Sequence, residues 1–274
     1  MTRESSLKLD HQDLVPKLNR LKEAMIQQLD ALVRDCDLTL GVPIESRVKT
    51  WESIEEKLER KGMTPKELEE VEDLLGLRVI FLFQRDLDPF HGKIKEIFNV
   101  MSEENTSDRL DDAQFGYHSR HYILTMPEGW NGVPSLNGLT GQKIELQVRT
   151  LAQHIWAAAS HKLQYKHEQS VPAPLRRSIY RVSALLETVD LEFIRVLDNL
   201  KEYREAQDTQ AADDDELNVT LVEMILDELL PPGNKDTGAE DYFSLLVDLQ
   251  QFEIKSRKNL INLLQESMHE YNAA

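Results

Sequence analysis

Apolar residues recur at steps of three and four in several parts of the chain, and this spacing places them on one face of an α-helix. Thr64-Pro65 adds a capping residue followed by proline, a pair that often opens a helix. The pattern predicts helices over residues 14–33, 46–60, 64–74, 88–100, 151–167, 175–204, 217–230 and 239–271.

Other segments have the composition or the period of strands. Residues 76–83 form a run rich in β-branched and aromatic side chains, which predicts a buried strand. Apolar and polar side chains alternate along residues 142–150, and residues 117–126 form a third candidate strand. Strands mixed with helices and then followed by helices alone predict an α+β fold, with a small sheet and an all-helical C-terminal extension.

The charge balance excludes several functions. The 274 residues include 32 Lys and Arg against 49 Asp and Glu, a net charge of −17. Broad capture of DNA or adhesion to an anionic membrane needs a basic surface instead. The first ten residues lack the apolar core of a signal peptide, the longest apolar run is too short to span a bilayer, and Cys36 is the one cysteine. We therefore expect a soluble, cytoplasmic protein that binds neither DNA nor membranes.

The acidity is concentrated near the C-terminus. Residues 201–274 carry 17 acidic and 6 basic residues. This shift in composition predicts an N-terminal helix over 1–40, a central α/β domain over 41–170 and an acidic helical extension over 171–274. The extension is expected to form oligomers, inhibit the site or bind a protein partner, and the sequence leaves these roles open.

Polar side chains with reactive groups occupy unusual positions. Glu145, Gln147 and Arg149 share one face of the strand predicted over 142–150, either as a solvated face or as the floor of a site for a polar ligand. Asp73 closes a predicted helix, where the macrodipole is unfavourable for an acid, and Arg78 enters an apolar strand. This pair is either an internal ion pair or part of a functional site.

Two further patches fit nucleotide chemistry. Arg47, Lys49 and Ser53 are predicted near the start of a helix, as a phosphate-binding patch or as a solvated face. Gly116 permits close backbone approach, and the adjacent Tyr117 is positioned to stack on a base or to pack on the core. Neither of the common glycine-rich phosphate loops occurs in the sequence.

Together these segments resemble the synthetase domain of the RelA/SpoT family, in order and spacing, from about residue 41 to residue 168. The matching segments are Arg47-Val-Lys49-x-x-x-Ser53-Ile54, Asp73-Leu-Leu-Gly76-Leu-Arg78-Val79, Gly116-Tyr117-His118-Ser119-Arg120-His121, Glu145-Leu-Gln147-Val-Arg149-Thr150, Trp156-Ala157 and His161-x-x-x-Tyr165-Lys166.

The resemblance implies a mixed β-sheet flanked by helices, similar to nucleotidyltransferases. It also implies transfer of the β,γ-pyrophosphate of ATP to the 3′-hydroxyl of GDP or GTP, with AMP and the alarmone ppGpp or pppGpp as products. Because the segment before Arg47 is short and has no His-Asp dipeptide, we expect no alarmone hydrolase domain. Small members of the family form homotetramers, so the resemblance also implies a homo-oligomer.

The resemblance assigns roles residue by residue. Asp73 and Glu145 would hold Mg²⁺, and Glu145 would also take the proton of the attacking hydroxyl. Arg47 and Arg78 would stack on both faces of the adenine. The remaining implied roles are ATP phosphate binding by Lys49 and Ser53, acceptor binding by Tyr117 and His121, support of the site by Gln147 and Arg149, and packing by Trp156.

Two other functions stay open at this point. Toxic relatives use an adenine nucleotide or the 3′ end of tRNA as acceptor, and stacking by Tyr117 does not distinguish among purines. The net charge disfavours tRNA, although a local basic patch would be possible from Lys143, Arg149, Lys162 and Lys166. A degenerate, non-catalytic binding protein is the third hypothesis, and the presence of both Asp73 and Glu145 argues against it.

Overall fold

The computed structural model describes residues 3–105, 119–163, 172–210, 215–231 and 240–273. The chain divides into two compact units, Met1–Ile194 and Arg195–Ala274, and the proposed site lies in the first. The domain boundaries expected from the sequence stay a prediction. Within the described residues, no helix is both long enough and apolar enough to cross a membrane.

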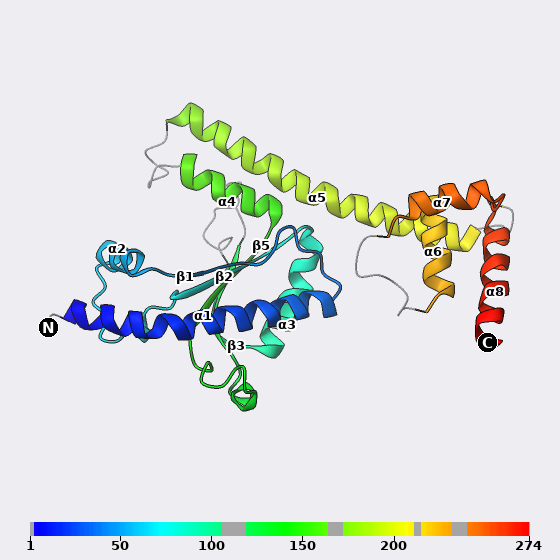
Figure 1. The fold of residues 1–274 in the computed structure, drawn as a ribbon. Coiled ribbons are helices and arrows are strands. Elements are labelled where there is room, and N and C mark those ends of the chain that lie inside the picture. The colour runs from blue at the N-terminus through cyan, green and yellow to red at the C-terminus, as the bar shows by residue number, and fades with distance from the viewer. Residues whose placement is uncertain (1–2, 106–118, 164–171, 211–214, 232–239, 274) are drawn as a thin grey trace. The chain divides into compact units, whose positions relative to one another are not determined.

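A five-stranded mixed sheet forms the centre of the larger unit, as Figure 1 shows. Its order is β1-β2-β5-β4-β3, with β2 and β5 parallel and the other neighbours antiparallel. The mixed sheet with flanking helices confirms the predicted fold class. The strands are β1 (Glu45–Val48), β2 (Leu75–Phe81), β3 (Asn99–Asn105), β4 (Arg120–Thr125) and β5 (Ile144–Thr150).

One face of the sheet belongs to the hydrophobic core. Helix α1 (Arg3–Asp35) and helix α3 (Leu87–Ile97) contribute buried side chains such as Leu21 and Ile94 to this core, which includes Leu146 of β5. Burial of each such side chain stabilises the fold by about 1.5–3 kcal/mol. The alternation predicted for β5 is therefore present, and it leaves Glu145 and Gln147 on the opposite face.

The helix predicted over 46–60 is wrong in its first part. Residues 45–48 instead form β1, because they pair antiparallel with β2 and tertiary pairing outweighs local periodicity. Thr50 then caps helix α2 (Trp51–Lys61) by accepting from the backbone N of Ser53 at 3.4 Å. Lys49 thus precedes the helix and does not share a helical face with Ser53.

The helix predicted over 64–74 is also wrong. Only a 3-10 turn, η1 (Leu68–Glu70), forms there, and Glu67 makes no capping hydrogen bond from its side chain. Leu68, Val71 and Leu74 are buried in the main core, so packing of these apolar residues determines the path of the chain. Asp73 therefore lies in a turn before β2, and it does not end a helix.

The smaller unit confirms the helical C-terminal extension but corrects one element. Helices α6 (Val219–Leu229), α7 (Tyr242–Gln251) and α8 (Arg257–Ala273) enclose a small core that includes Val222 and Leu249. The single helix predicted over 239–271 is interrupted between α7 and α8, where Glu253 adopts a positive φ of 63°. The remaining elements are α4 (Leu151–Leu163), α5 (Ala173–Gln210) and the 3-10 turns η2 (Gln84–Asp86) and η4 (Glu128–Gly132).

Candidate active site

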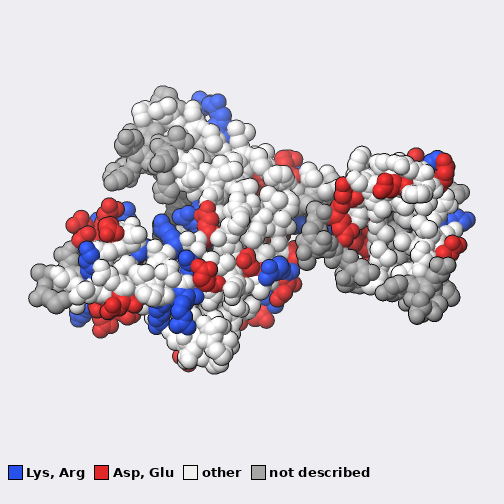
Figure 2. All heavy atoms as spheres, in the orientation of Figure 1, with Lys and Arg blue, Asp and Glu red and all other residues white. Residues whose placement is uncertain are grey.

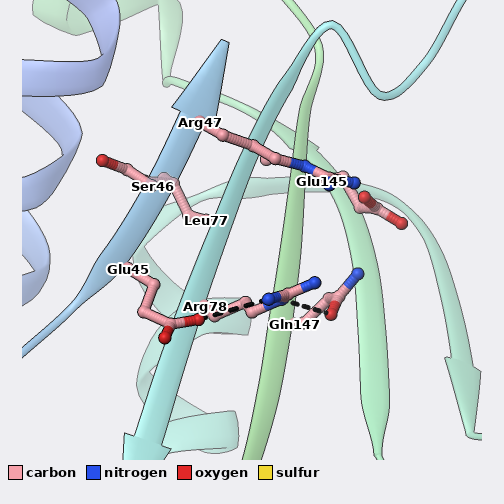
Figure 3. Close-up of a pocket in the computed structure, with 8 residues that line it drawn as sticks. Glu45, Ser46, Arg47, Leu77, Arg78, Glu145 and Gln147 are labelled. Atoms are coloured by element: carbon pink, nitrogen blue, oxygen red, sulfur yellow. Dashed lines mark hydrogen bonds and ion pairs between the residues drawn. The ribbon is translucent and has the colours of Figure 1, made fainter. Parts of the chain in front are cut away.

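Two rows of side chains cross the polar face of the sheet. Glu45, Arg78 and Gln147 are register partners on β1, β2 and β5. Arg47 and Glu145 lie opposite Gly76 in the next row on the same face. Because side chains two residues apart on a strand share a face, both rows point to one side of the sheet, as Figure 3 shows.

These rows line a cleft with a volume of about 390 Å³. Gly76 has no side chain to fill the space between Arg47 and Glu145. A methyl group added there would lie 3.8 Å from Oε2 of Glu145, in van der Waals contact, so any longer side chain would enter the cleft. The lining residues are Glu45, Ser46, Arg47, Gly76, Leu77, Arg78, Glu145 and Gln147.

A second cleft, of about 420 Å³, adjoins the first. The two share Arg47, Arg78 and Gln147, so two ligands bound there would lie close together. The second cleft also contains His121, whose Nδ1 lies 3.8 Å from Oε1 of Glu145. Its other lining residues are Ser119, Arg149, His154, Trp156, Ala157, Ala158 and Ser160.

Asp73 is held by two lysines. Its Oδ2 accepts from Nζ of Lys49 at 2.5 Å, and its Oδ1 lies 2.6 Å from Nζ of Lys57. Burial by itself would raise the pKa of Asp73, but the hydrogen bonds and charges of both lysines outweigh it and lower the pKa. The carboxylate is therefore ionised at neutral pH, in a cluster with one excess positive charge.

Lys57 is a residue that the sequence analysis missed. It lies one helical turn after Ser53 on α2, and that spacing was the available signal. Basic side chains also gather on the surface between α2 and α4, as Figure 2 shows. This local positive charge is compatible with phosphate binding even though the chain as a whole is acidic.

The carboxylates of Asp73 and Glu145 have the donor chemistry that Mg²⁺ prefers. Asp73 does not line the cleft that contains Glu145, and it precedes Gly76, the register partner of Glu145, by three positions. In the part of the chain that the structure describes, no group of three or more His, Cys, Asp or Glu side chains is placed to hold a metal ion. An ion bound by both carboxylates would need further ligands from phosphates and water. Joint binding of Mg²⁺ by Asp73 and Glu145 stays a prediction.

His154 and Glu45 are two further polar residues of the clefts that the sequence analysis did not select. Burial, followed by the charge of Arg149, lowers the pKa of His154. Its Nε2 lies 4.0 Å from Oε1 of Glu45. The imidazole is therefore neutral at neutral pH, and no simple sequence pattern marks either residue.

The structure brings most of the predicted residues to one region. Arg47, Arg78, Glu145 and Gln147 line the first cleft, and His121 and Arg149 line the second. Arg149 is buried, with 6% of its surface exposed, so it is not part of a solvated face. Lys49 donates a hydrogen bond to Asp73 and does not line either cleft. Ser53 is exposed in the first turn of α2, and Tyr117 lies outside the described residues.

A mixed sheet with two adjoining clefts, lined by arginines and a carboxylate, is suited to transfer between two nucleotides. Residues 46–170 match the family described as "Region found in RelA / SpoT proteins". The chain belongs to the RelA/SpoT family, and its fold is that of the small alarmone synthetases.

Curated relatives and solved structures agree with this assignment. GTP pyrophosphokinase YwaC of Bacillus subtilis is 32% identical over 160 residues, which cover 56% of this chain and 74% of that protein. GTP pyrophosphokinase YjbM of Bacillus subtilis is 29% identical over 174 residues, which cover 60% of this chain and 77% of that protein.

Small alarmone synthetase 1 of Bacillus subtilis superposes with a TM-score of 0.56 at 25% identity. The match covers 70% of this chain and 97% of that one. A further crystal structure of that synthetase contains its product pppGpp. Enzymes of the pyrophosphokinase type thus share both sequence and fold with this chain.

Proposed function

We propose that this protein is a (p)ppGpp synthetase, which transfers the β,γ-pyrophosphate of ATP to the 3′-hydroxyl of GDP or GTP and releases AMP. The observation that carries the proposal is the pair of adjoining clefts that share Arg47, Arg78 and Gln147. One cleft would hold ATP and the other the acceptor. Two substrates held side by side react without the entropy cost of a collision.

The donor nucleotide would bind through stacking and charge. The planar guanidinium groups of Arg47 and Arg78 are suited to the two faces of adenine, which a lysine would not match. Lys49 and Lys57 would bind the triphosphate, with Ser53 at the start of α2 close to the same phosphates. Each of these contacts places positive charge where the phosphates carry negative charge.

The transfer itself is a displacement at the β-phosphorus. The bond from the acceptor 3′-oxygen to that phosphorus forms while the bond between the phosphorus and the α-phosphate oxygen breaks, and AMP leaves. Glu145 would accept the proton of the 3′-hydroxyl. Nδ1 of His121 lies 3.8 Å from Oε1 of this carboxylate. A Mg²⁺ ion held by Asp73 and Glu145 would neutralise charge on the phosphates when bound.

The acceptor would bind in the second cleft. Tyr117 would stack on the guanine, with His121 beside the same nucleotide and with Gln147 and Arg149 as supports of the site. A homo-oligomeric state, Mg²⁺ dependence and a cytoplasmic location are further parts of the proposal.

A panel of acceptors tests the function directly. The protein is incubated with labelled ATP, Mg²⁺ and, separately, GDP, GTP, AMP, ADP, ATP and deacylated tRNA. We expect labelled ppGpp with GDP and labelled pppGpp with GTP, with equimolar AMP. Transfer to an adenine nucleotide or to tRNA would identify a different acceptor class, and absence of any transfer would identify a non-catalytic binding protein.

A further inference from the structure

Two side chains from neighbouring strands hold Arg78. Its Nη1 donates to Oε2 of Glu45 at 3.2 Å, and its Nε donates to Oε1 of Gln147 at 3.1 Å. All three are register partners in one row across β1, β2 and β5. The strand pairing therefore aligns an acceptor on each side of the guanidinium, as the dashed lines of Figure 3 indicate.

The positions of these bonds favour stacking on Arg78. Hydrogen bonds to a guanidinium form in its plane, so acceptors at the edges leave both flat faces free of hydrogen-bond partners. An unrestrained arginine has several rotatable bonds and loses about 2 kcal/mol of side-chain entropy when it is fixed. An arginine already held by neighbours loses less of this freedom when a ring stacks on it.

Glu45 is suited to this role by its charge as well as its place. It forms an ion pair with Arg78, and charge-assisted hydrogen bonds are stronger than neutral ones. His154, at 4.0 Å from the other carboxylate oxygen, has a lowered pKa and is neutral, so it does not compete for the charge of Glu45. Glu45 also lies one residue before the segment that matches the family, which begins at residue 46.

We propose that Glu45 is a positioning residue, which acts with Gln147 to hold the Arg78 guanidinium ready to stack on the adenine of the donor nucleotide. This inference rests on the proposed function, because it assigns the first cleft to ATP. Glu45 touches Arg78 and is not itself expected to contact the reacting atoms.

The test compares Glu45→Ala, Glu45→Gln and Glu96→Ala in the full chain. Glu96 is a matched control, an exposed glutamate that pairs with Lys93 on α3, away from the clefts. Binding of a non-hydrolysable ATP analogue with Mg²⁺ is measured by calorimetry. We expect Glu45→Ala to bind the analogue about tenfold more weakly than the unaltered chain does. Glu45→Gln should bind it within about threefold of the unaltered chain, because the amide oxygen still accepts a hydrogen bond. Glu96→Ala should bind it as the unaltered chain does.

A second background separates positioning from a general structural effect. In Arg78→Ala, the further change Glu45→Ala is expected to weaken binding by less than about twofold, because the group that Glu45 holds is gone. In turnover assays, KM for ATP should rise in Glu45→Ala more than kcat falls, with KM for the acceptor unchanged.

Two results would overturn the inference while leaving the proposed function intact. One is unchanged analogue binding in Glu45→Ala, and the other is an undiminished effect of that change in the Arg78→Ala background. If the unaltered chain binds no ATP analogue and transfers no pyrophosphate, then the proposed function fails and the inference fails with it.

Discussion

Nζ of Lys57 lies 2.6 Å from Oδ1 of Asp73, and both side chains are largely buried. Lys49 holds the other oxygen of the same carboxylate. The proposed metal ligand is therefore engaged by two of the cations that we assign to the triphosphate. Binding of ATP would have to redistribute these charges, which links the lysines to donor binding.

Substitution of Lys57 should weaken use of ATP. We expect Lys57→Met to raise KM for ATP about tenfold, because a charge-assisted contact to phosphate is lost. The control is Lys61→Met, in the last turn of the same helix and exposed. Steady-state kinetics at saturating GDP provide the measurement, and equal KM values for the two variants would contradict the role of Lys57.

The same ion pair should make stability depend on pH. The folded state lowers the pKa of Asp73, so it binds a proton less readily than the unfolded chain does. The stabilisation is present at neutral pH and is lost as pH falls through the lowered folded-state pKa. Lys57→Met should therefore reduce the free energy of unfolding by about 1.5–3 kcal/mol at neutral pH and by progressively less in acid. Urea titrations across pH measure this, and a difference independent of pH would count against it.

Substitution of Glu145 should separate chemistry from folding. Glu145→Gln removes the proposed base and metal ligand, so we expect transfer to fall by at least about 100-fold. The free energy of unfolding should change by less than about 0.5 kcal/mol, as for most partly exposed polar positions. Glu128→Gln, in the exposed turn η4, is the control. Normal turnover in Glu145→Gln would remove Glu145 from the mechanism.

Thr150 connects the end of β5 to two helices. Its backbone N donates to Oε1 of Gln153 at 2.7 Å, and its Oγ1 accepts from the backbone N of Gln153 at 3.1 Å, a capping box for α4. The same hydroxyl donates to Oδ2 of Asp190 at 2.6 Å. Thr150→Val should lower the free energy of unfolding by about 2–3 kcal/mol, because buried polar groups lose their partner. Thr150→Ser keeps the hydroxyl and should lower the free energy of unfolding by less. Chemical denaturation of both variants measures the difference, and equal losses would contradict the role of the hydroxyl.

His91 should destabilise the protein when it is protonated. Burial, followed by the charge of Arg120, lowers the pKa of His91 to about 4, and its Nδ1 lies 2.7 Å from the hydroxyl of Tyr122. Between the ordinary pKa of histidine and about 4, the unfolded chain binds more protons than the folded one, so stability falls with pH by up to about 3 kcal/mol. His91→Gln should remove this slope. Denaturation at several pH values measures it, and an unchanged slope would point to another group.

Much of the fold was predictable because its signals are local. The apolar run over residues 76–83 and the alternation over 142–150 gave two adjacent strands of the sheet close to their observed bounds. The start of the helix predicted over 46–60 was wrong because residues 45–48 pair with β2 as a strand. The helix predicted over 64–74 was wrong because burial of Leu68 and Val71 sets the course of the backbone there. Strand β3 was missed because its side chains are mostly exposed and show no apolar alternation.

The candidate site was predictable where a residue stood out in a local pattern or belonged to a family segment, as Arg47 and His121 do. Arg78 stood out as a cation in an apolar strand, and Glu145 stood out on a regular polar face. Glu45 and Lys57 broke no rule in the sequence. Their importance comes from the partners that they contact, Arg78 and Asp73, which are 33 and 16 positions away along the chain.

The sequence by itself determined most of the helices, the strands β2, β4 and β5, the α+β class and the residue types suited to nucleotide chemistry. These follow from local periodicity and from the family motifs, which short segments carry independently of one another. The tertiary structure alone decided which polar groups meet, because strand register aligns Glu45, Arg78 and Gln147 in one row and packing brings Lys57 to Asp73. Such contacts depend on how distant segments pair, which no local pattern specifies.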